Sequence, residues 1–285
     1  MTMAQPELLR AAQLLNESGA LLVCAGAGMG VDSGLPDFRG TQGFWQAYPA
    51  LAQAGIAFHE IANPASFETD PALAWGFYGH RLALYRETNP HAGFAILRRL
   101  AASLPGGAFV FTSNVDGQFQ RAGFDDAGIV ECHGSIHHLQ CSLPCSDAVW
   151  SADDFMPEVD VAACRLRTPL PRCPRCGALA RPNILMFNDG AWLEARAEAQ
   201  LERLRAWRRD AQTGVDKLVV IELGAGLAIP SVRRMSEAQG VPIIRINPRD
   251  AQLDGHPGVA ISLTAHDALA ALPSLFNRKH QDLSS

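Results

Sequence analysis

The sequence contains no run of 18 apolar residues, so it lacks a segment that could cross a bilayer as a helix. It also lacks a basic N-terminal segment followed by an apolar one, which argues against export. A positive net charge is missing as well, because the formal charge is −5 at pH 7. We therefore expect a globular, cytoplasmic protein that binds neither membranes nor nucleic acid directly.

The cysteines do not form the even set that a disulfide framework needs, since the chain has seven of them. Four stand in two close pairs, Cys141-x3-Cys145 and Cys173-x2-Cys176. Such pairs supply the four sulfur ligands of a tetrahedral Zn²⁺. Because four thiolates leave no open coordination position, the pattern predicts a structural zinc and not a catalytic one. The alternative is two clusters of reduced thiols without a metal.

Short apolar runs alternate with helical patterns along much of the chain, whose 285 residues can bury a sizeable core. The region from 44 to 85 instead carries many aromatic residues at helical spacing, which indicates an inserted helical module with an aromatic core. The alternation predicts an α/β fold with a doubly wound parallel sheet. Strands are expected at 21–25, 108–112, 128–132, 218–223, 242–247 and 259–263, and helices at 6–18, 90–100, 191–211, 230–239 and 265–276.

The first apolar run ends in Gly26-Ala27-Gly28, a loop whose backbone can approach a phosphate closely because glycine has no Cβ. The spacing supplies two glycines of a dinucleotide fingerprint, but Val31 occupies the place of the third. A tight turn without a ligand is therefore an alternative. The run Pro36–Gly40 then adds a rigid turn, a carboxylate, an aromatic ring and a guanidinium, which is more than a turn requires.

Polar residues follow two of the predicted strands. Ser113, Asn114 and Asp116 come after the strand at 108–112, and His133 comes after the strand at 128–132. Ligands of open α/β sheets bind outside the carboxyl ends of the strands, so these residues are candidates for a site. A neutral imidazole at this place could act as a general base on a hydroxyl group, although a purely structural histidine is the alternative.

Taken together, these motifs resemble the sirtuin family. The Gly-Ala-Gly loop with Ser33–Gly40 is similar to the sirtuin loop and its Ser-Gly-Ile-Pro-Asp-Phe-Arg-Gly run. Thr112–Gly117 resembles Thr-Gln-Asn-Ile-Asp-Gly, Glu131–Ser135 resembles the catalytic His-Gly motif, and the four cysteines match the zinc module. Arg181–Phe187 is similar to the strand that pairs with the substrate backbone, and Gly224–Pro230 is similar to a second phosphate loop.

The resemblance implies a domain organisation. A Rossmann-like NAD-binding domain would comprise residues 1–40, 88–138 and 181–280. A helical module at 41–87 and a zinc-binding module at 139–180 would interrupt it. NAD and the acylated lysine of a substrate protein would meet in the cleft between these parts.

The resemblance also implies a reaction, in which NAD is a co-substrate and not a hydride carrier. Acyl groups would be removed from lysine, giving nicotinamide, O-acyl-ADP-ribose and free lysine. His133 would deprotonate a ribose hydroxyl, while Asn114 and Asp116 would position ribose and nicotinamide. Ile184, Met186 and Phe187 would bind the substrate. The resemblance assigns cofactor binding to Gly26, Ala27, Gly28, Asp37, Phe38, Arg39, Ser113, Asn114, Asp116, Gly224, Ala225, Gly226 and Asn247.

The sequence departs from the family pattern at several of these places. Asn188-Asp189 replaces Gly-Glu after the substrate strand, and Ala225-Gly226 replaces Thr-Ser in the second loop. An ADP-ribosyltransferase or NAD glycohydrolase on the same scaffold is therefore an alternative activity. A module that senses NAD without consuming it is a third possibility, against which His133 argues.

Tyr78 and Arg81 are three residues apart on a predicted helix, hence neighbours on one face. They resemble the Tyr-x-x-Arg signature of sirtuins that prefer malonyl, succinyl or glutaryl lysine. A guanidinium can bind a distal carboxylate bidentately, so the pair predicts desuccinylation beside deacetylation. The alternative is that Tyr78 packs in the aromatic core and Arg81 is a surface charge.

Overall fold

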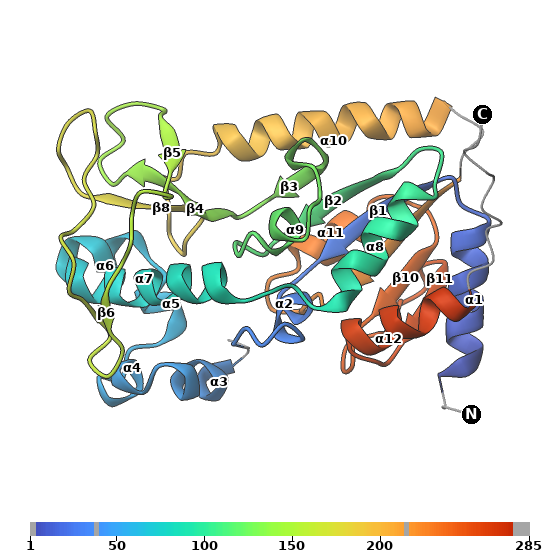
Figure 1. Cartoon of the computed structure of the whole chain (residues 1–285), viewed down its shortest axis with the longest axis horizontal. Helices are drawn as coiled ribbons and strands as arrows, with labels where there is room; N and C mark the ends of the chain where they lie inside the picture. The colour runs from blue at the N-terminus through green and yellow to red at the C-terminus, as the bar shows by residue number, and fades with distance from the viewer. Residues whose placement is uncertain (1–3, 37–39, 214–216, 276–285) are drawn as a thin grey trace.

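The computed structural model describes residues 4–36, 40–213 and 217–275, and it has two parts (Figure 1). The larger part is built on a parallel six-stranded sheet in the spatial order β11–β10–β9–β1–β2–β3. The predicted doubly wound α/β architecture is therefore confirmed. The strands are β1 (Ala20–Ala25), β2 (Ala108–Thr112), β3 (Ile129–Glu131), β9 (Leu218–Leu223), β10 (Ile243–Ile246) and β11 (Gly258–Ile261).

Helices cover both faces of this sheet, which is why its central strands are continuous apolar runs. Alternate residues of β1 belong to different cores: Leu21 and Val23 face one side, and Leu22 and Cys24 face the other. The first core is completed by α1 (Gln5–Asn16), α8 (Ala92–Ala102) and α12 (Ala265–Ala271), with the short helix η2 (Leu272–Ser274) behind α12. The second is completed by α10 (Ala195–Thr213) and α11 (Ser231–Glu237).

The strand order reverses between β1 and β9, which pair with Ala25 opposite Leu223. The crevice outside the carboxyl ends of the strands at such a reversal is the usual place for a ligand. The two glycine loops both begin here, one after β1 and one after β9. The first continues into the short helix α2 (Gly28–Val31).

The smaller part lies on the left of Figure 1. It combines five helices with the antiparallel sheet β5–β4–β8 and the two-stranded sheet β6–β7. The indole N–H of Trp75 donates to the Ala180 carbonyl at 2.9 Å and so joins helices to sheet. The elements are α3 (Gly40–Ala47), α4 (Pro49–Gln53), α5 (Phe58–Ile61), α6 (Pro64–Thr69), α7 (Pro71–Glu87), β4 (Gly134–Cys141), β5 (Val149–Ser151), β6 (Val159–Asp160), β7 (Arg165–Leu166) and β8 (Ala180–Ile184).

The helical and zinc-binding regions share one apolar core, in which Phe44, Trp75 and Phe77 pack with Ile136 and Leu139. The aromatic core that the sequence predicts for residues 44–85 is thus confirmed. The domain boundaries expected after residues 138 and 180 fall inside the strands β4 and β8. These two strands therefore connect the two parts of the molecule. Among the described residues, no helix is both long and apolar enough to span a bilayer.

Candidate active site

The two glycine loops contact each other directly. The N–H of Gly26 donates to the Leu223 carbonyl at 2.9 Å, and that of Gly28 donates to the Gly224 carbonyl at 3.1 Å. A Cβ on Gly26 would lie 2.8 Å from the Ala225 Cα, and a Cβ on Gly224 would lie 2.5 Å from the Gly28 Cα. Gly224 also has a φ of +58°, which favours glycine. Glycine at these positions is therefore a requirement of loop packing.

Some backbone N–H groups have no protein acceptor where the two glycine loops are in contact. In the described part of the chain, the N–H groups of Ala27, Ala225 and Gly226 donate to no protein acceptor. Ala27 is exposed, whereas the side chain of Ala225 is buried. Backbone N–H groups in glycine-rich turns are suited to anionic groups such as phosphates. The geometry therefore fits the predicted phosphate-binding role of both loops.

Two asparagines hold the loops in place. The Asn114 amide donates to the Gly26 carbonyl at 3.1 Å. The amide of Asn247 is fully buried and donates to the Ala225 carbonyl at 2.8 Å, while its oxygen accepts the N–H groups of Arg249 and Asp250 at 3.0 Å. Each asparagine thus fixes one loop. Their contacts with a cofactor stay predictions.

His133 lies two residues after the end of β3, at the carboxyl edge of the sheet. Its Nε2 atom is 3.1 Å from the Ser231 hydroxyl, at the start of α11, and the ring also forms a hydrogen bond with the Ser113 backbone. Burial lowers the pKa of His133 below the ordinary value of 6.5, and the Ser113 backbone opposes this only in part. The imidazole is therefore neutral at pH 7, as a general base must be. Nothing in the sequence pattern marks Ser231 beyond its place after the second glycine loop.

Asp116 is buried between the first glycine loop and the start of α9 (Gln118–Arg121). One carboxyl oxygen accepts the Gln118 N–H at 2.9 Å, and a Cβ on Gly30 would lie 3.2 Å from the other. Burial raises the pKa of Asp116 to about 6, although the Gln118 N–H opposes the shift. A carboxyl group with a pKa of about 6 can be either protonated or ionised near neutral pH.

The segment after β8 runs beside His133, because the N–H of Leu185 donates to the His133 carbonyl at 3.0 Å. Side chains alternate along it. Ile184 and Met186 are buried in the aromatic core, whereas Leu185 and Phe187 are 40% and 38% exposed. Of the three residues of this segment that are expected to bind substrate, only Phe187 has an exposed side chain. Leu185 was missed, although a period of two along an extended segment places it with Phe187.

A buried ion pair fixes the turn that follows this segment. The Arg181 guanidinium donates to both Asp189 carboxyl oxygens, at 2.7 and 2.8 Å, and Asp189 also accepts the Met186 N–H at 3.3 Å. Both charged side chains are almost fully buried. Asn188-Asp189, where the sequence departs from the family pattern, therefore forms a structural anchor beneath the exposed segment.

Tyr78 and Arg81 both lie inside the smaller part, with only 1% and 7% of their surface exposed. The Tyr78 ring stacks on Phe67 at a centroid distance of 5.6 Å. The Arg81 guanidinium donates to the Tyr85 hydroxyl at 2.8 and 3.0 Å and lies over the Phe77, Tyr78 and Tyr85 rings. Arg81 is therefore no surface charge. Binding of a distal carboxylate by this pair stays a prediction.

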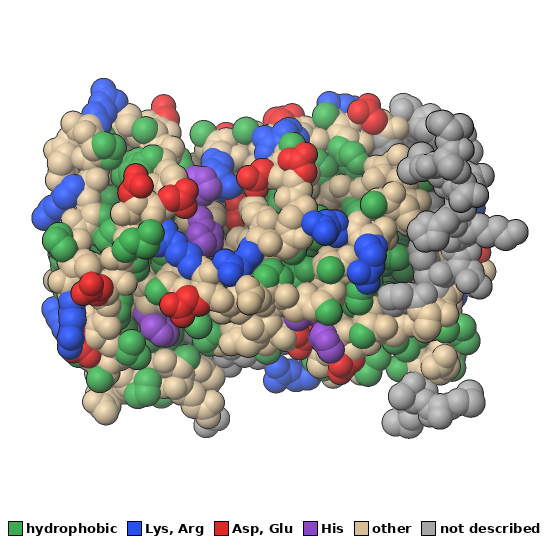
Figure 2. All heavy atoms as spheres, viewed as in Figure 1, with side chains coloured by type: hydrophobic (Ala, Val, Ile, Leu, Met, Phe, Trp, Pro, Cys, Tyr) green, Lys and Arg blue, Asp and Glu red, His purple; other side chains and the backbone are tan. Residues whose placement is uncertain are grey.

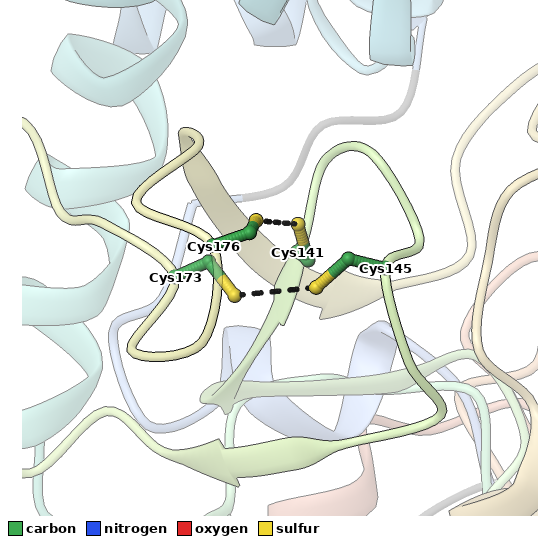
Figure 3. Close-up of side chains that lie close together, drawn as sticks. All are labelled: Cys141, Cys145, Cys173 and Cys176. Carbon is green, nitrogen blue, oxygen red and sulfur yellow. Dashed lines mark hydrogen bonds between the residues drawn. The ribbon is translucent and has the colours of Figure 1, made fainter.

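The four predicted zinc ligands converge in space (Figure 3). Cys141 Sγ is 3.6 Å from Cys176 Sγ, and Cys145 Sγ is 3.7 Å from Cys173 Sγ; all four sulfur atoms lie within 4.8 Å of one another. A tetrahedral zinc with Zn–S bonds of about 2.3 Å requires sulfur–sulfur distances of roughly 3.8 Å. The four cysteines thus form a closed site that fits a structural zinc ion.

Three of the predicted cofactor contacts, Asp37, Phe38 and Arg39, lie outside the described residues. Ser113 is half-buried, and its N–H donates to the Ala25 carbonyl at 3.2 Å, so its backbone joins β2 to the start of the first glycine loop. The structure therefore gathers Ser113, Asn114 and His133 around the two loops.

Comparison with known proteins gives one consistent family. A family model described as the Sir2 family matches residues 26–207. An NAD-dependent protein deacylase of Methylococcus capsulatus is 30% identical over 249 residues, which cover 86% of this chain and 87% of the relative. NAD-dependent protein deacylase 2 of Pyrobaculum aerophilum is 30% identical over 275 residues, which cover 95% of this chain and 96% of the relative.

Solved structures have the same fold. A Sir2 homologue mutant in complex with ADP-ribose has a TM-score of 0.67 at 25% identity, with 93% of this chain and 95% of that chain covered. A further Sir2 homologue mutant, in complex with 2′-O-acetyl ADP-ribose, has a TM-score of 0.67 at 25% identity, with 95% and 98% covered. The similarity extends over both parts of the molecule.

Proposed function

The chain belongs to the Sir2 family, and we propose that it is an NAD-dependent deacylase that removes acyl groups from lysine side chains of proteins. Relatives named NAD-dependent protein deacylase align over nearly the whole chain, and Sir2 homologues of the same fold bind ADP-ribose and its acetyl ester. A cytoplasmic location and the absence of nucleic-acid binding remain predictions from composition.

The position of His133 is the observation that carries the proposal for the chemistry. Its carbonyl oxygen accepts the Leu185 N–H at 3.0 Å, so its backbone is joined to the segment that would bind substrate. Its ring lies 3.1 Å from Ser231, which follows the second glycine loop. One residue therefore connects the candidate protein-binding segment with the candidate nucleotide-binding loops.

In this proposal NAD supplies the ribose that accepts the acyl group, and nicotinamide is its leaving group. The Nε2 atom of His133 takes the proton from a ribose hydroxyl, which its lowered pKa permits at pH 7. The free N–H groups of Ala27, Ala225 and Gly226 hold the phosphates, and Asn114 orders the loop beside them.

The substrate peptide would lie along residues 184–187 in an extended conformation. The side chains of Leu185 and Phe187 are exposed there, while Ile184 and Met186 anchor the segment in the core. Phe187 contacts the ring of Phe58 at a centroid distance of 5.9 Å, so its position is fixed by the helical module. An apolar, ordered edge of this kind suits pairing with a peptide backbone.

The acyl preference follows from Arg81. A guanidinium held among three aromatic rings is costly to bury, and a carboxylate on the acyl chain would offer it a charged hydrogen-bond acceptor. We therefore expect activity on succinyl-lysine in addition to acetyl-lysine, with Tyr78 as the neighbouring hydroxyl.

Product analysis tests the proposed function. The purified protein is incubated with NAD and a peptide carrying acetyl-lysine or succinyl-lysine, and the products are identified by mass spectrometry. The proposal predicts O-acyl-ADP-ribose, nicotinamide and free lysine in equal amounts. Free or protein-linked ADP-ribose without deacylated peptide would instead identify a glycohydrolase or transferase, and unchanged NAD would contradict both activities.

A further inference from the structure

A cavity lies behind the Asp116–Gly117 turn, between β4, α9 and α10. Its volume is about 490 Å³, which falls in the range of small-molecule sites. Figure 2 shows this face, where histidine side chains lie in a hollow and basic side chains surround it. Asp116 lies in its wall, and its carbonyl oxygen is 3.0 Å from His137 Nε2 on β4.

The cavity wall is strongly basic for a protein whose net charge is negative. Four guanidinium groups line it, those of Arg86, Arg121, Arg196 and Arg203, together with the rings of His137 and His138. The carboxylic residues in the wall are Asp116 and Asp126. Because the chain as a whole carries a formal charge of −5, this concentration of positive charge is local.

Most of these guanidinium groups are not neutralised by a carboxylate of the protein. Arg86 donates to the carbonyl oxygens of Ala152 and Phe155, at 2.7 and 2.8 Å. Arg121 donates to the Asn89 amide oxygen at 3.0 Å, and Arg203 donates to the Ala127 carbonyl at 3.1 Å. Among the described residues, none of these three forms an ion pair with a carboxylate.

Arg196 is the exception, and it also offers an unused donor. Its Nη2 atom donates to a Glu131 carboxyl oxygen at 2.5 Å, while its Nη1 atom is buried and has no hydrogen-bond partner. The Nδ1 atom of His138 is likewise buried without a partner. A buried guanidinium donor without an acceptor is uncommon, and here it belongs to a residue that lines the basic cavity.

We propose that this cavity is a second ligand site, which binds a small polyanion. Guanidinium groups from α7, α9 and α10 line it, and guanidinium groups are suited to binding phosphate or carboxylate groups. Arg121 and Arg203 are exposed, whereas Arg86 and Arg196 are half-buried. A bound polyanion would lie directly behind the turn that carries Asp116.

Calorimetric titration with inorganic triphosphate tests this site, and citrate in a parallel titration distinguishes phosphate from carboxylate ligands. We expect saturable binding of at least one of the two. In Arg203→Gln and, separately, in Arg121→Gln, each loss of a charged donor should weaken binding by about tenfold. Arg121 and Arg203 donate only to an amide oxygen and to backbone carbonyl oxygens of the protein, and thermal melting of each variant confirms that it is folded.

Arg205→Gln is the matched control, because Arg205 lies on the same helix, is exposed, and pairs with Glu202 outside the cavity. Its affinity should stay within twofold of the parent protein. Repeating the titration with excess ADP-ribose separates this cavity from the glycine loops, since a triphosphate held at the loops would be displaced. Displacement, absence of binding by both probes, or equal losses in all three variants would overturn the proposal.

Discussion

The ring of His133 and the hydroxyl of Ser231 lie within hydrogen-bonding distance, with Nε2 and Oγ 3.1 Å apart, although 98 positions separate the two residues in the chain. The contact joins the end of β3, at one edge of the sheet, to the start of α11 beyond the second glycine loop. The orientation of the candidate base is therefore set by the half of the sheet that would hold the nucleotide.

The pH dependence of turnover should report the state of His133. Burial lowers the pKa of His133 below 6.5, so the neutral form dominates at pH 7 and the rate rises with pH only through the lowered pKa. We expect kcat/KM to be level above pH 7 and to fall on the acid side of pH 6.5. Circular dichroism at each pH excludes unfolding as the cause. An acid limb centred well above pH 7 would show that another group is the base.

Asp116→Asn should stabilise the protein while it lowers activity. The pKa of Asp116 is raised from 3.8 to about 6, so the folded state favours the protonated carboxyl, and that advantage is lost as the pH rises through 6. An amide mimics the neutral form and keeps the acceptor for the Gln118 N–H. At pH 8 the variant should gain roughly 3 kcal/mol or less in free energy of unfolding.

This gain should shrink as the pH falls toward 5, because the parent carboxyl is then protonated too. Urea denaturation at both pH values measures the difference, and turnover is measured in parallel. If the gain is the same at both pH values, folding does not raise the pKa of Asp116.

Cys173→Ser and Cys176→Ser should each release zinc and loosen the smaller part of the molecule. All four sulfur atoms lie within 4.8 Å of one another, and the binding free energy of a structural metal is part of the folding free energy. Metal analysis and limited proteolysis between β4 and β8 measure the effect. Cys164→Ala, which removes a buried thiol outside the cluster, should keep one zinc per chain. A zinc-free parent protein would refute the assignment.

Arg81→Met should lower desuccinylation much more than deacetylation. The substitution keeps an unbranched apolar side chain among the rings of Phe77, Tyr78 and Tyr85 and removes only the charged donor. Loss of a charged hydrogen bond to the acyl carboxylate predicts a decrease of about tenfold or more in kcat/KM for the succinyl peptide. Equal losses on both peptides would leave Arg81 with a structural role alone.

Much of the sheet could be predicted from the sequence. The bounds of β2 and β9 agree with the predicted ones, because both strands are buried apolar runs that end at a change to polar or glycine residues. The strand β4 escaped prediction. Its burial pattern is interrupted at His137 and His138, which line the basic cavity, so no regular alternation marks it.

The residues of the candidate site could be predicted from the sequence, but their arrangement in space could be predicted much less well. Glycine loops and the cysteine pairs have local spacing rules, so the sequence identifies them. His133 and Ser231 come into contact only in the folded chain, and no local spacing in the sequence predicts this contact. The same holds for residues 184–187: alternation pairs Leu185 with Phe187, but only the packing of the core decides which pair is exposed.

The most direct test of the central claim is the rate at which O-acetyl-ADP-ribose forms in His133→Ala, with His256→Ala as the control because His256 lies half-exposed beyond β10. We predict a decrease of at least about 100-fold for His133→Ala in single-turnover experiments, with NAD affinity retained within a few fold, since a general base contributes to rate and not to binding. His256→Ala should match the parent protein. Full turnover in His133→Ala would contradict the account.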